Sequence, residues 1–251
     1  MAYFSFRYGT PVAIIIGGPL DGEIIHLFDP DIDKAPRHYD RPIEHLNLKR
    51  GKVFPLPSSK PEQCYAAGPN GSGKSYYISK YMTLWRQIFP DHPIWVISDL
   101  KEDPVIDKVK GVQRIPLNES IIDDPLKPEE FKDSLVVFDD IDSIADKDIA
   151  KAVNTLKDSL LKTSRHHNAY VLVTNHMICD YGKTRIIINE CRNITVFPKS
   201  GASNQISRIL KEYCGLSEKQ LRVIMDIDSR WVTVHKNYPM YITYDHGIML
   251  I

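Results

Sequence analysis

The sequence lacks the features that mark several whole classes of protein. Among its 251 residues, 32 are basic and 32 acidic, so a strongly basic nucleic-acid coat protein is excluded, although local basic loops are not. No apolar run approaches the ~20 residues of a membrane-spanning helix. Residues 1–10 also contain no sustained apolar segment of the kind found in signal peptides. We therefore expect an intracellular, soluble protein.

Cysteine is scarce and scattered. The four cysteines are far apart and form no Cys-x-x-Cys pair, so neither a zinc site nor a disulfide framework is expected in a chain of this length. We interpret them as small apolar residues in a reducing compartment. They are Cys64, Cys179, Cys191 and Cys214.

The hydrophobic pattern predicts strands that alternate with helices. Short apolar runs typical of buried strands occur at residues 64–67, 94–98, 135–138, 170–174 and 194–197. Helical spacing of apolar residues occurs at residues 77–88, 148–163, 184–190, 206–213 and 217–225. This rhythm predicts an α/β fold with a mainly parallel central sheet and helices on both faces.

Antiparallel hairpins are predicted at both ends of the chain. Their strands are expected at residues 12–16 and 23–27, and at residues 231–235 and 240–244. Between them we also expect a loop or arm at 29–48, strands at 52–56, 112–115 and 248–251, and a short helix at 105–109. We therefore divide the chain into an N-terminal hairpin and arm (1–60), a core (61–200), and C-terminal helices and antiparallel strands packed on the core (201–251).

The core begins with a glycine-rich phosphate-binding motif. A predicted strand is followed by Gly-Pro-Asn-Gly-Ser-Gly-Lys-Ser and then by a predicted helix, the context that a P-loop requires. The glycines allow backbone N–H groups to point at phosphate oxygens, and the helix N-terminus adds partial positive charge. We expect ATP and Mg²⁺ to bind here, with Lys74 on the phosphates and Ser75 on the metal. The nucleotide-binding residues are predicted to be Gly68, Pro69, Asn70, Gly71, Ser72, Gly73, Lys74, Ser75 and Tyr76.

Two acids follow the apolar run 135–138, and they favour hydrolysis of the bound nucleotide. We assign Asp139 to the metal and Asp140 to the attacking water, because hydrolysis needs a metal ligand and a group that orients or deprotonates water. Asp142 competes with Asp140 for the second role. Asp140 could instead serve as a helix cap or a loop acid.

Two further polar positions are candidates for catalysis. Arg165, in a polar turn before the run 170–174, could enter a neighbouring subunit's site as an arginine finger, or belong to a solvated basic turn. Asn175 follows the same run and could sense the γ-phosphate or position water, or it could cap the strand end.

The order of these motifs resembles a known group. The P-loop, the strand ending in Asp139 and Asp140, the Arg165 turn, the strand before Asn175 and the Cys-Arg-Asn sequence around Arg192 follow one another over residues 62–200. Together they resemble the FtsK–HerA superfamily of P-loop DNA translocases. Within it, the chain is most similar to the viral branch, the genome-packaging ATPases of poxvirus-like large DNA viruses and of tailless membrane-containing viruses.

The resemblance implies a RecA-like P-loop NTPase core in a homo-oligomeric ring, a pentamer or a hexamer, that moves double-stranded DNA into a capsid. It implies the same roles for Lys74, Ser75, Asp139 and Asp140, and a trans arginine finger at Arg165 or, alternatively, Arg192. The chain departs from the family at Asn175, where Gln is common, and Asp140 is shorter than the Glu of many relatives. Capsid or membrane proteins at a packaging vertex are implied partners, and the host cytoplasm, a virus factory or the virion an implied location.

Several other functions fit part of this pattern. A non-viral DNA pump of the same superfamily and a nucleotide-gated assembly protein with little hydrolysis both use a P-loop. A small-molecule kinase would need an arginine-rich lid, and none stands out. For a translocase, candidate DNA-contacting cations are Lys147, Lys151, Lys183 and Arg185, which could equally be ordinary solvated charges.

Overall fold

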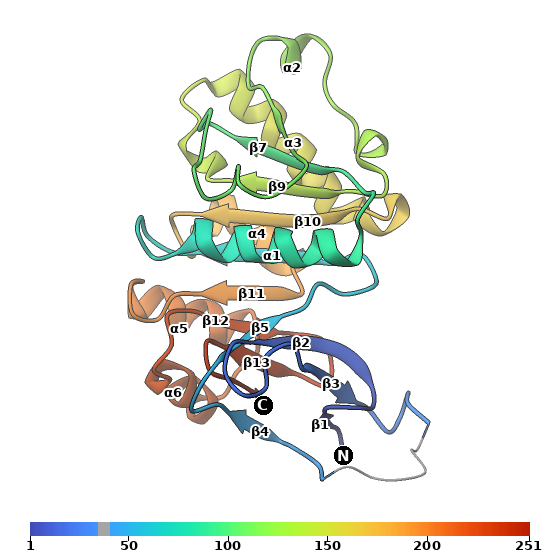
Figure 1. Ribbon diagram of the computed structural model, residues 1–251. Helices are drawn as coiled ribbons and strands as arrows, with labels where there is room; N and C mark the ends of the chain where they lie inside the picture. Colours follow the sequence, from blue (N-terminus) through green and yellow to red (C-terminus); the bar gives the residue numbers. More distant parts are fainter. Residues whose placement is uncertain (35–40) are drawn as a thin grey trace.

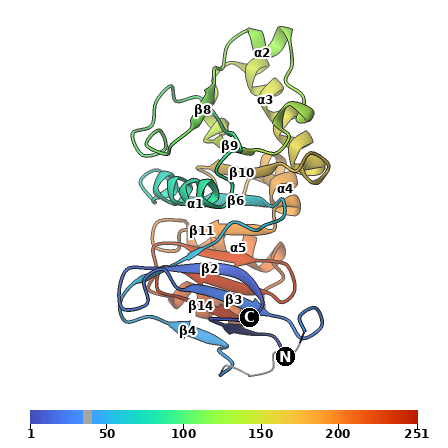
Figure 2. The same ribbon diagram turned by 45° about the vertical axis from the view of Figure 1, so that its right-hand side comes forward.

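A computed structural model describes residues 1–34 and 41–251 of the protein. Residues 35–40, part of the arm expected at 29–48, lie outside the described residues. Within the described part, the central sheet has ten strands in the order β4-β14-β13-β12-β11-β6-β10-β9-β7-β8 (Figures 1 and 2). No helix in this part of the chain is both long and apolar enough to cross a membrane.

The six strands from β11 to β8 are parallel, and they form the core of the sheet. They are β6 (Gln63–Ala67), β7 (Ile94–Ser98), β8 (Val112–Ile115), β9 (Leu135–Asp139), β10 (Tyr170–Asn175) and β11 (Asn193–Val196). β6, β9 and β10 are buried along their whole length, which explains their unbroken apolar sequences. The predicted α/β fold with a mainly parallel sheet is confirmed.

Helices cover both faces of this sheet. Along β6, Cys64 and Ala66 contribute to the cluster that packs on α1, whereas Tyr65 and Ala67 contribute to the cluster under the other helices, because strand side chains alternate between faces. The helices are α1 (Lys74–Ile88) on one face, and α3 (Lys147–Thr163), α4 (Tyr181–Glu190), α5 (Ser203–Glu212) and α6 (Glu218–Asp226) on the other. A capping box of Ser217 and Gln220 begins α6.

Antiparallel strands extend the sheet beyond β11. They are β12 (Val232–His235), β13 (Tyr241–Tyr244), β14 (Gly247–Leu250) and β4 (His45–Asn47). The predicted C-terminal hairpin is confirmed, and it continues the same sheet as the P-loop strand. This continuity brings the C-terminal segment to the edge of the sheet where the nucleotide motif lies.

A second sheet of four antiparallel strands comes from the N-terminal part of the chain. Its order is β1-β3-β2-β5, with β1 (Tyr3–Ser5), β2 (Thr10–Ile16), β3 (Ile24–Phe28) and β5 (Lys52–Pro55). The predicted N-terminal hairpin is β2 and β3. Tyr241 and Ile248 of the central sheet pack into the same apolar cluster as the residues of this sheet.

The helix predicted at 105–109 is wrong. Asp103 Oδ1 accepts hydrogen bonds from the N–H groups of Val105 and Ile106, and Asp107 Oδ2 accepts one from Asp103 N–H, so side chains hold an isolated turn there. Ile106 and Val109 are buried, which explains the helix-like spacing. Short segments that were not predicted are α2 (Ser120–Asp123) and the 3₁₀ helices η1 (Pro128–Phe131), η2 (Ile141–Ser143) and η3 (Ser164–His167).

All four cysteines carry free thiols, and three of them are buried. Burial raises the pKa of Cys64 and Cys191 well above the usual thiol range, and that of Cys214 to about 12. Cys179 is half-buried, between β10 and α4. The interpretation of the cysteines as small apolar residues is confirmed for the three buried ones.

Candidate active site

The candidate site lies at the carboxyl ends of three neighbouring parallel strands. β10 lies between the P-loop strand β6 and the acid-bearing strand β9 (Figure 2), and all three run in the same direction. Lys74, Asp139, Asp140 and Asn175 are therefore brought to one edge of the sheet, where ligands of open α/β sheets bind.

The P-loop has the backbone that its glycines predict. Gly68 N–H donates to the carbonyl of Asn175 at 3.1 Å, and Gly71 and Gly73 have φ values of 75° and 111°, in the left-handed region. A Cβ on Gly68 would lie 2.8 Å from the Phe197 ring, so no larger residue fits there. Helix α1 begins at Lys74, and its first N–H groups have no intrahelical acceptor. These donors suit an anionic ligand.

The side chain of Lys74 is buried and held by acceptors of the site itself. Its Nζ donates to the Gly68 carbonyl at 3.0 Å, lies 3.2 Å from His176 Nδ1 and lies 3.6 Å from Asp140 Oδ1. His176 Nε2 is in turn 3.1 Å from Asp140 Oδ2. With His176 protonated on Nε2, its ring can accept from Lys74 and donate to Asp140. Lys74, His176 and Asp140 therefore form one polar cluster.

Thr174 connects the two acids. Its hydroxyl donates to Asp139 Oδ1 at 2.8 Å and accepts from Asp140 N–H at 3.0 Å. Asp139 is 2% exposed, and burial together with the charge of Asp140 raises its pKa to about 6. Asp140 has φ 47° and ψ 39°, a left-handed conformation that aspartate tolerates better than most residues. This backbone directs its carboxylate toward Lys74.

Replacing Asp139 with asparagine is expected to make the ligand-free protein more stable at neutral pH. The folded-state pKa of about 6 lies above the ordinary value of 3.8. The contribution of Asp139 to the free energy of unfolding is therefore fully present below about pH 4, where the carboxyl is protonated. It is lost as the pH rises through 6, and the loss is on the order of 2–3 kcal/mol in all. The side chain of asparagine does not titrate, so the Asp139→Asn variant lacks this pH dependence. Urea unfolding in EDTA across this range measures the difference.

The control is Asp123→Asn, which removes a carboxylate that is exposed rather than buried. If wild type and Asp139→Asn have parallel pH profiles of unfolding free energy, the Asp139 carboxylate does not titrate in the folded chain as inferred.

Two buried polar atoms of the site have no hydrogen-bond partner in the described part of the chain. They are Asn175 Oδ1, at the end of β10, and Ser72 Oγ, inside the P-loop. An unpartnered buried acceptor or hydroxyl is costly, so both atoms are available to a ligand that enters this edge. Asp140, Asp142 and His176 also place possible cation ligands within 4.8 Å of one another. The carboxylate oxygens at this edge suit Mg²⁺ and the N–H groups at the start of α1 suit phosphate, so the residues present can accommodate a magnesium nucleotide.

The two candidate arginine fingers lie at the opposite edge of the sheet. Arg165 is exposed in η3, before β10, and Arg192 directly precedes β11. The intervening strands measure roughly 15–20 Å at about 3.3 Å per residue. Neither arginine can therefore reach the P-loop of its own chain.

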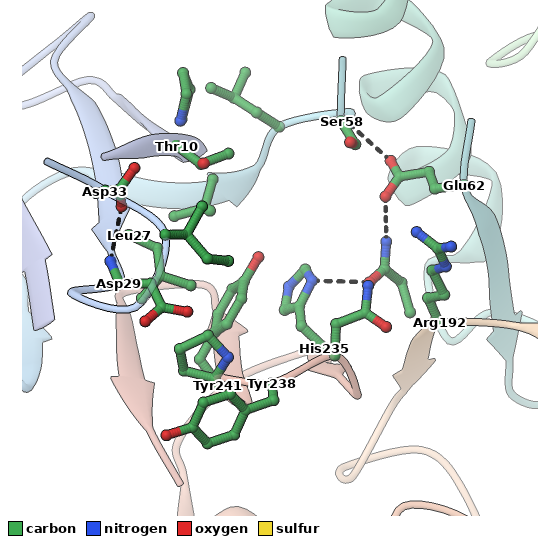
Figure 3. Close-up of a pocket in the computed structure, with 17 residues that line it drawn as sticks. Thr10, Leu27, Asp29, Asp33, Ser58, Glu62, Arg192, His235, Tyr238 and Tyr241 are labelled. Carbon is green, nitrogen blue, oxygen red and sulfur yellow. Dashed lines mark hydrogen bonds between the residues drawn. The ribbon is translucent and has the colours of Figure 1, made fainter. Parts of the chain in front are cut away.

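Arg192 is the less accessible of the two arginines. It lines a pocket of about 210 Å³ beside the buried Glu62, with His235 and Tyr241 on the pocket's other walls (Figure 3). Burial and the nearby charge of Arg165 hold the pKa of Arg192 below its usual range, while Glu62 opposes the shift. The exposed guanidinium of Arg165 is the better placed to meet another subunit.

Three residues of this edge were not predicted: Thr174, His176 and Arg230. Thr174 and His176 flank Asn175 at the end of β10, so the strand end that identified Asn175 also contains the signal for them. Arg230 lies just before β12, whose pairing with β11 places it beside the P-loop. No motif marks it, because its position depends on how the C-terminal strands join the sheet.

Comparison with known proteins finds a relative of this chain in a virophage. No family model matches it. A protein of Sputnik virophage, described as uncharacterized protein V3, is 36% identical over 241 residues, which cover 94% of each chain. The chain belongs to the family of this virophage protein.

The fold of the chain is that of P-loop ATPases. The genome-packaging NTPase B204 of Sulfolobus turreted icosahedral virus 2, in complex with ATP-γS, superimposes with a TM-score of 0.50 and 14% identity over 73% of this chain and 96% of B204. The pCW3 conjugation coupling protein TcpA gives 0.51 and 15% over 94% of this chain and 77% of TcpA. The cytoplasmic domain of Thermomonospora curvata EccC, a type VII secretion ATPase, gives 0.52 and 13% over 87% of this chain and 30% of EccC. The sequence resemblance is confirmed at the level of the fold.

Proposed function

We propose that the chain is an ATP-hydrolysing translocase of double-stranded DNA, a viral genome-packaging motor that works as a homo-oligomeric ring. The observation that carries this proposal is the cluster at the carboxyl edge of the sheet. Lys74 Nζ lies 3.6 Å from Asp140, Thr174 joins Asp140 to Asp139, and the Asn175 amide oxygen has no partner in the described residues. Such a site holds a triphosphate on one side and acids on the other.

The roles follow from this geometry. The N–H groups of the P-loop and Lys74 bind the β- and γ-phosphates, and Ser75 and Asp139 are the proposed ligands of Mg²⁺. Bound Mg²⁺ would offset the negative charge of the phosphates. Asp140 accepts a proton from the water that attacks the γ-phosphorus, and the bond to the β–γ bridging oxygen breaks, which gives ADP and phosphate. Asn175 orients that water.

Hydrolysis is favoured over phosphoryl transfer to a small molecule because the Asp140 carboxylate lies 3.6 Å from Lys74 Nζ, and Thr174 joins Asp140 to Asp139. DNA transport is supported by the packaging NTPase whose fold the chain shares over 96% of that protein. Lys147 and Lys151 are exposed on α3, which begins at the P-loop edge, and are proposed to contact DNA phosphates. Partners would include a capsid or membrane protein at the packaging vertex.

Double-stranded DNA is expected to stimulate ATP hydrolysis by the assembled protein, and Lys74→Ala to abolish both basal and stimulated activity. The buried Lys74 ammonium is the proposed phosphate clamp, and alanine removes it without replacing its charge. Phosphate release is measured with and without linear duplex DNA at several salt concentrations, because phosphate contacts weaken as salt rises. Lys80→Ala, further along α1, is the matched control for loss of a lysine.

Each result has a definite meaning for the proposal. Stimulation that falls with salt supports a DNA motor. ATPase activity that duplex DNA does not change, in assemblies verified by light scattering, would exclude translocation. Nucleotide binding without turnover under any condition would favour the nucleotide-gated assembly protein.

A further inference from the structure

An arginine from outside the P-loop core lies against the P-loop. The position that a Cβ would take on Gly73 is 3.6 Å from both Cδ and Nε of Arg230. Gly73 directly precedes α1, where the free N–H groups of the phosphate cradle lie. The charged end of Arg230 is thus beside the proposed phosphate site, although Arg230 follows Gly73 by more than 150 residues in the sequence.

The backbone that carries Arg230 is fixed relative to α1. Arg230 N–H donates to Asp245 Oδ2 at 2.9 Å, and the buried Ser229 accepts from Asp245 N–H at 2.9 Å. The next residue, Trp231, is 2% exposed and packs edge-on against Tyr77 of α1, with ring centroids 5.2 Å apart. Residues on both sides of Arg230 are therefore anchored, and its side chain projects from a rigid segment.

The guanidinium of Arg230 has no hydrogen bond or ion pair within residues 1–34 and 41–251. Asp245 accepts a hydrogen bond from the Arg230 backbone N–H, but not from the guanidinium. Its other carboxylate oxygen, Oδ1, lies 3.9 Å from Lys52 Nζ. Arg230 is exposed, so its donors are available to an incoming group. A planar arginine fork matches two oxygens of a phosphate, and the N–H groups that begin α1 draw a phosphate to this end of the helix.

We propose that Arg230 binds a phosphate group of the nucleotide held by the P-loop of the same chain. This inference rests on the proposed function, since it assumes that the P-loop holds a nucleotide. It adds a cation from the segment before β12 to a site whose other groups come from residues 68–176. Arg230 then acts in cis, in contrast to Arg165 at the far edge.

Arg230→Ala is expected to weaken binding of ATP-γS about 10–100-fold in the presence of Mg²⁺, because a charged hydrogen-bond pair to phosphate is lost. Arg230→Lys keeps the charge without the fork and should recover part of the affinity. Arg222→Ala, an exposed arginine on α6, is the matched control and should bind like wild type. Titration calorimetry gives the affinities, and circular dichroism checks that each variant is folded.

If Arg230→Ala binds ATP-γS as tightly as Arg222→Ala, the proposal is wrong. It is equally wrong if Arg230→Ala lowers the affinity for a duplex oligonucleotide and leaves that for ATP-γS unchanged, since Arg230 would then be a DNA contact. Should the alanine variant not fold, Arg230→Gln and Arg230→Lys carry the same comparison. Lys74→Ala separates the two proposals: if it too binds ATP-γS normally, the P-loop assignment itself fails.

Discussion

Asp140→Asn is expected to lower kcat for ATP hydrolysis by about 10²–10⁴-fold, the range typical of a lost general base, while ATP still binds. Asparagine has nearly the shape of aspartate and also tolerates the left-handed backbone at this position. It cannot accept a proton from water. Single-turnover phosphate release measures the chemical step, and calorimetry with ATP-γS measures binding.

Asp142→Asn is the matched control, since Asp142 accepts a hydrogen bond from His176 N–H at 3.3 Å and lies in the same cluster. Asp142 is exposed, whereas Asp140 is largely buried beside Lys74. We therefore expect a small effect at Asp142. If instead Asp142→Asn loses turnover and Asp140→Asn keeps it, Asp142 is the base and Asp140 has a local structural role.

Arg165→Ala is expected to lose about 10³–10⁵-fold in kcat, as for other arginine fingers, and to regain activity when mixed with inactive Asp140→Asn subunits. An Arg165→Ala subunit keeps an intact P-loop edge, and an Asp140→Asn subunit keeps an intact Arg165. In a ring with head-to-tail interfaces, roughly a quarter of the interfaces in an equal mixture combine the two intact halves. Phosphate release by the mixture, compared with each variant alone, tests this.

Rings in the mixture must first be shown to exchange subunits, by co-purification of two differently tagged variants. The control for nonspecific stabilisation is wild type mixed with subunits that carry both substitutions, Arg165→Ala and Asp140→Asn. If an exchanged mixture stays inactive, Arg165 is not the finger. Repeating the mixture with Arg192→Ala then tests the alternative, although Arg192 first has to leave its half-buried position beside Glu62.

Sequence patterns predicted most of the elements that build this edge. The P-loop, β9 and β10 were predictable because strands buried on both faces have unbroken apolar runs, and their ends are marked by Gly68, by Asp139 and by Asn175. These signals are local. Each required at most a few neighbouring residues, and the order of the motifs then indicated the family.

The elements that were missed depend on contacts between distant segments. Arg230 reaches the P-loop through the pairing of β12 with β11 and through Asp245, fifteen residues further along the chain. The turn at 105–109 has helix-like apolar spacing, but the Asp103 and Asp107 side chains bond the backbone locally and prevent helix growth. His176 has no role until the fold places it between Lys74 and Asp140.

The burial of three of the four thiols gives the natural chain a single practical position for a spectroscopic label. Cys64, Cys191 and Cys214 are enclosed, and their raised pKa values suppress the reactive thiolate. Cys179 is half-buried between β10 and α4, three residues after His176. A maleimide fluorophore would therefore report on the catalytic edge of the sheet without any engineered cysteine. A change in its fluorescence when ATP and Mg²⁺ are added would report nucleotide binding in the unmodified sequence.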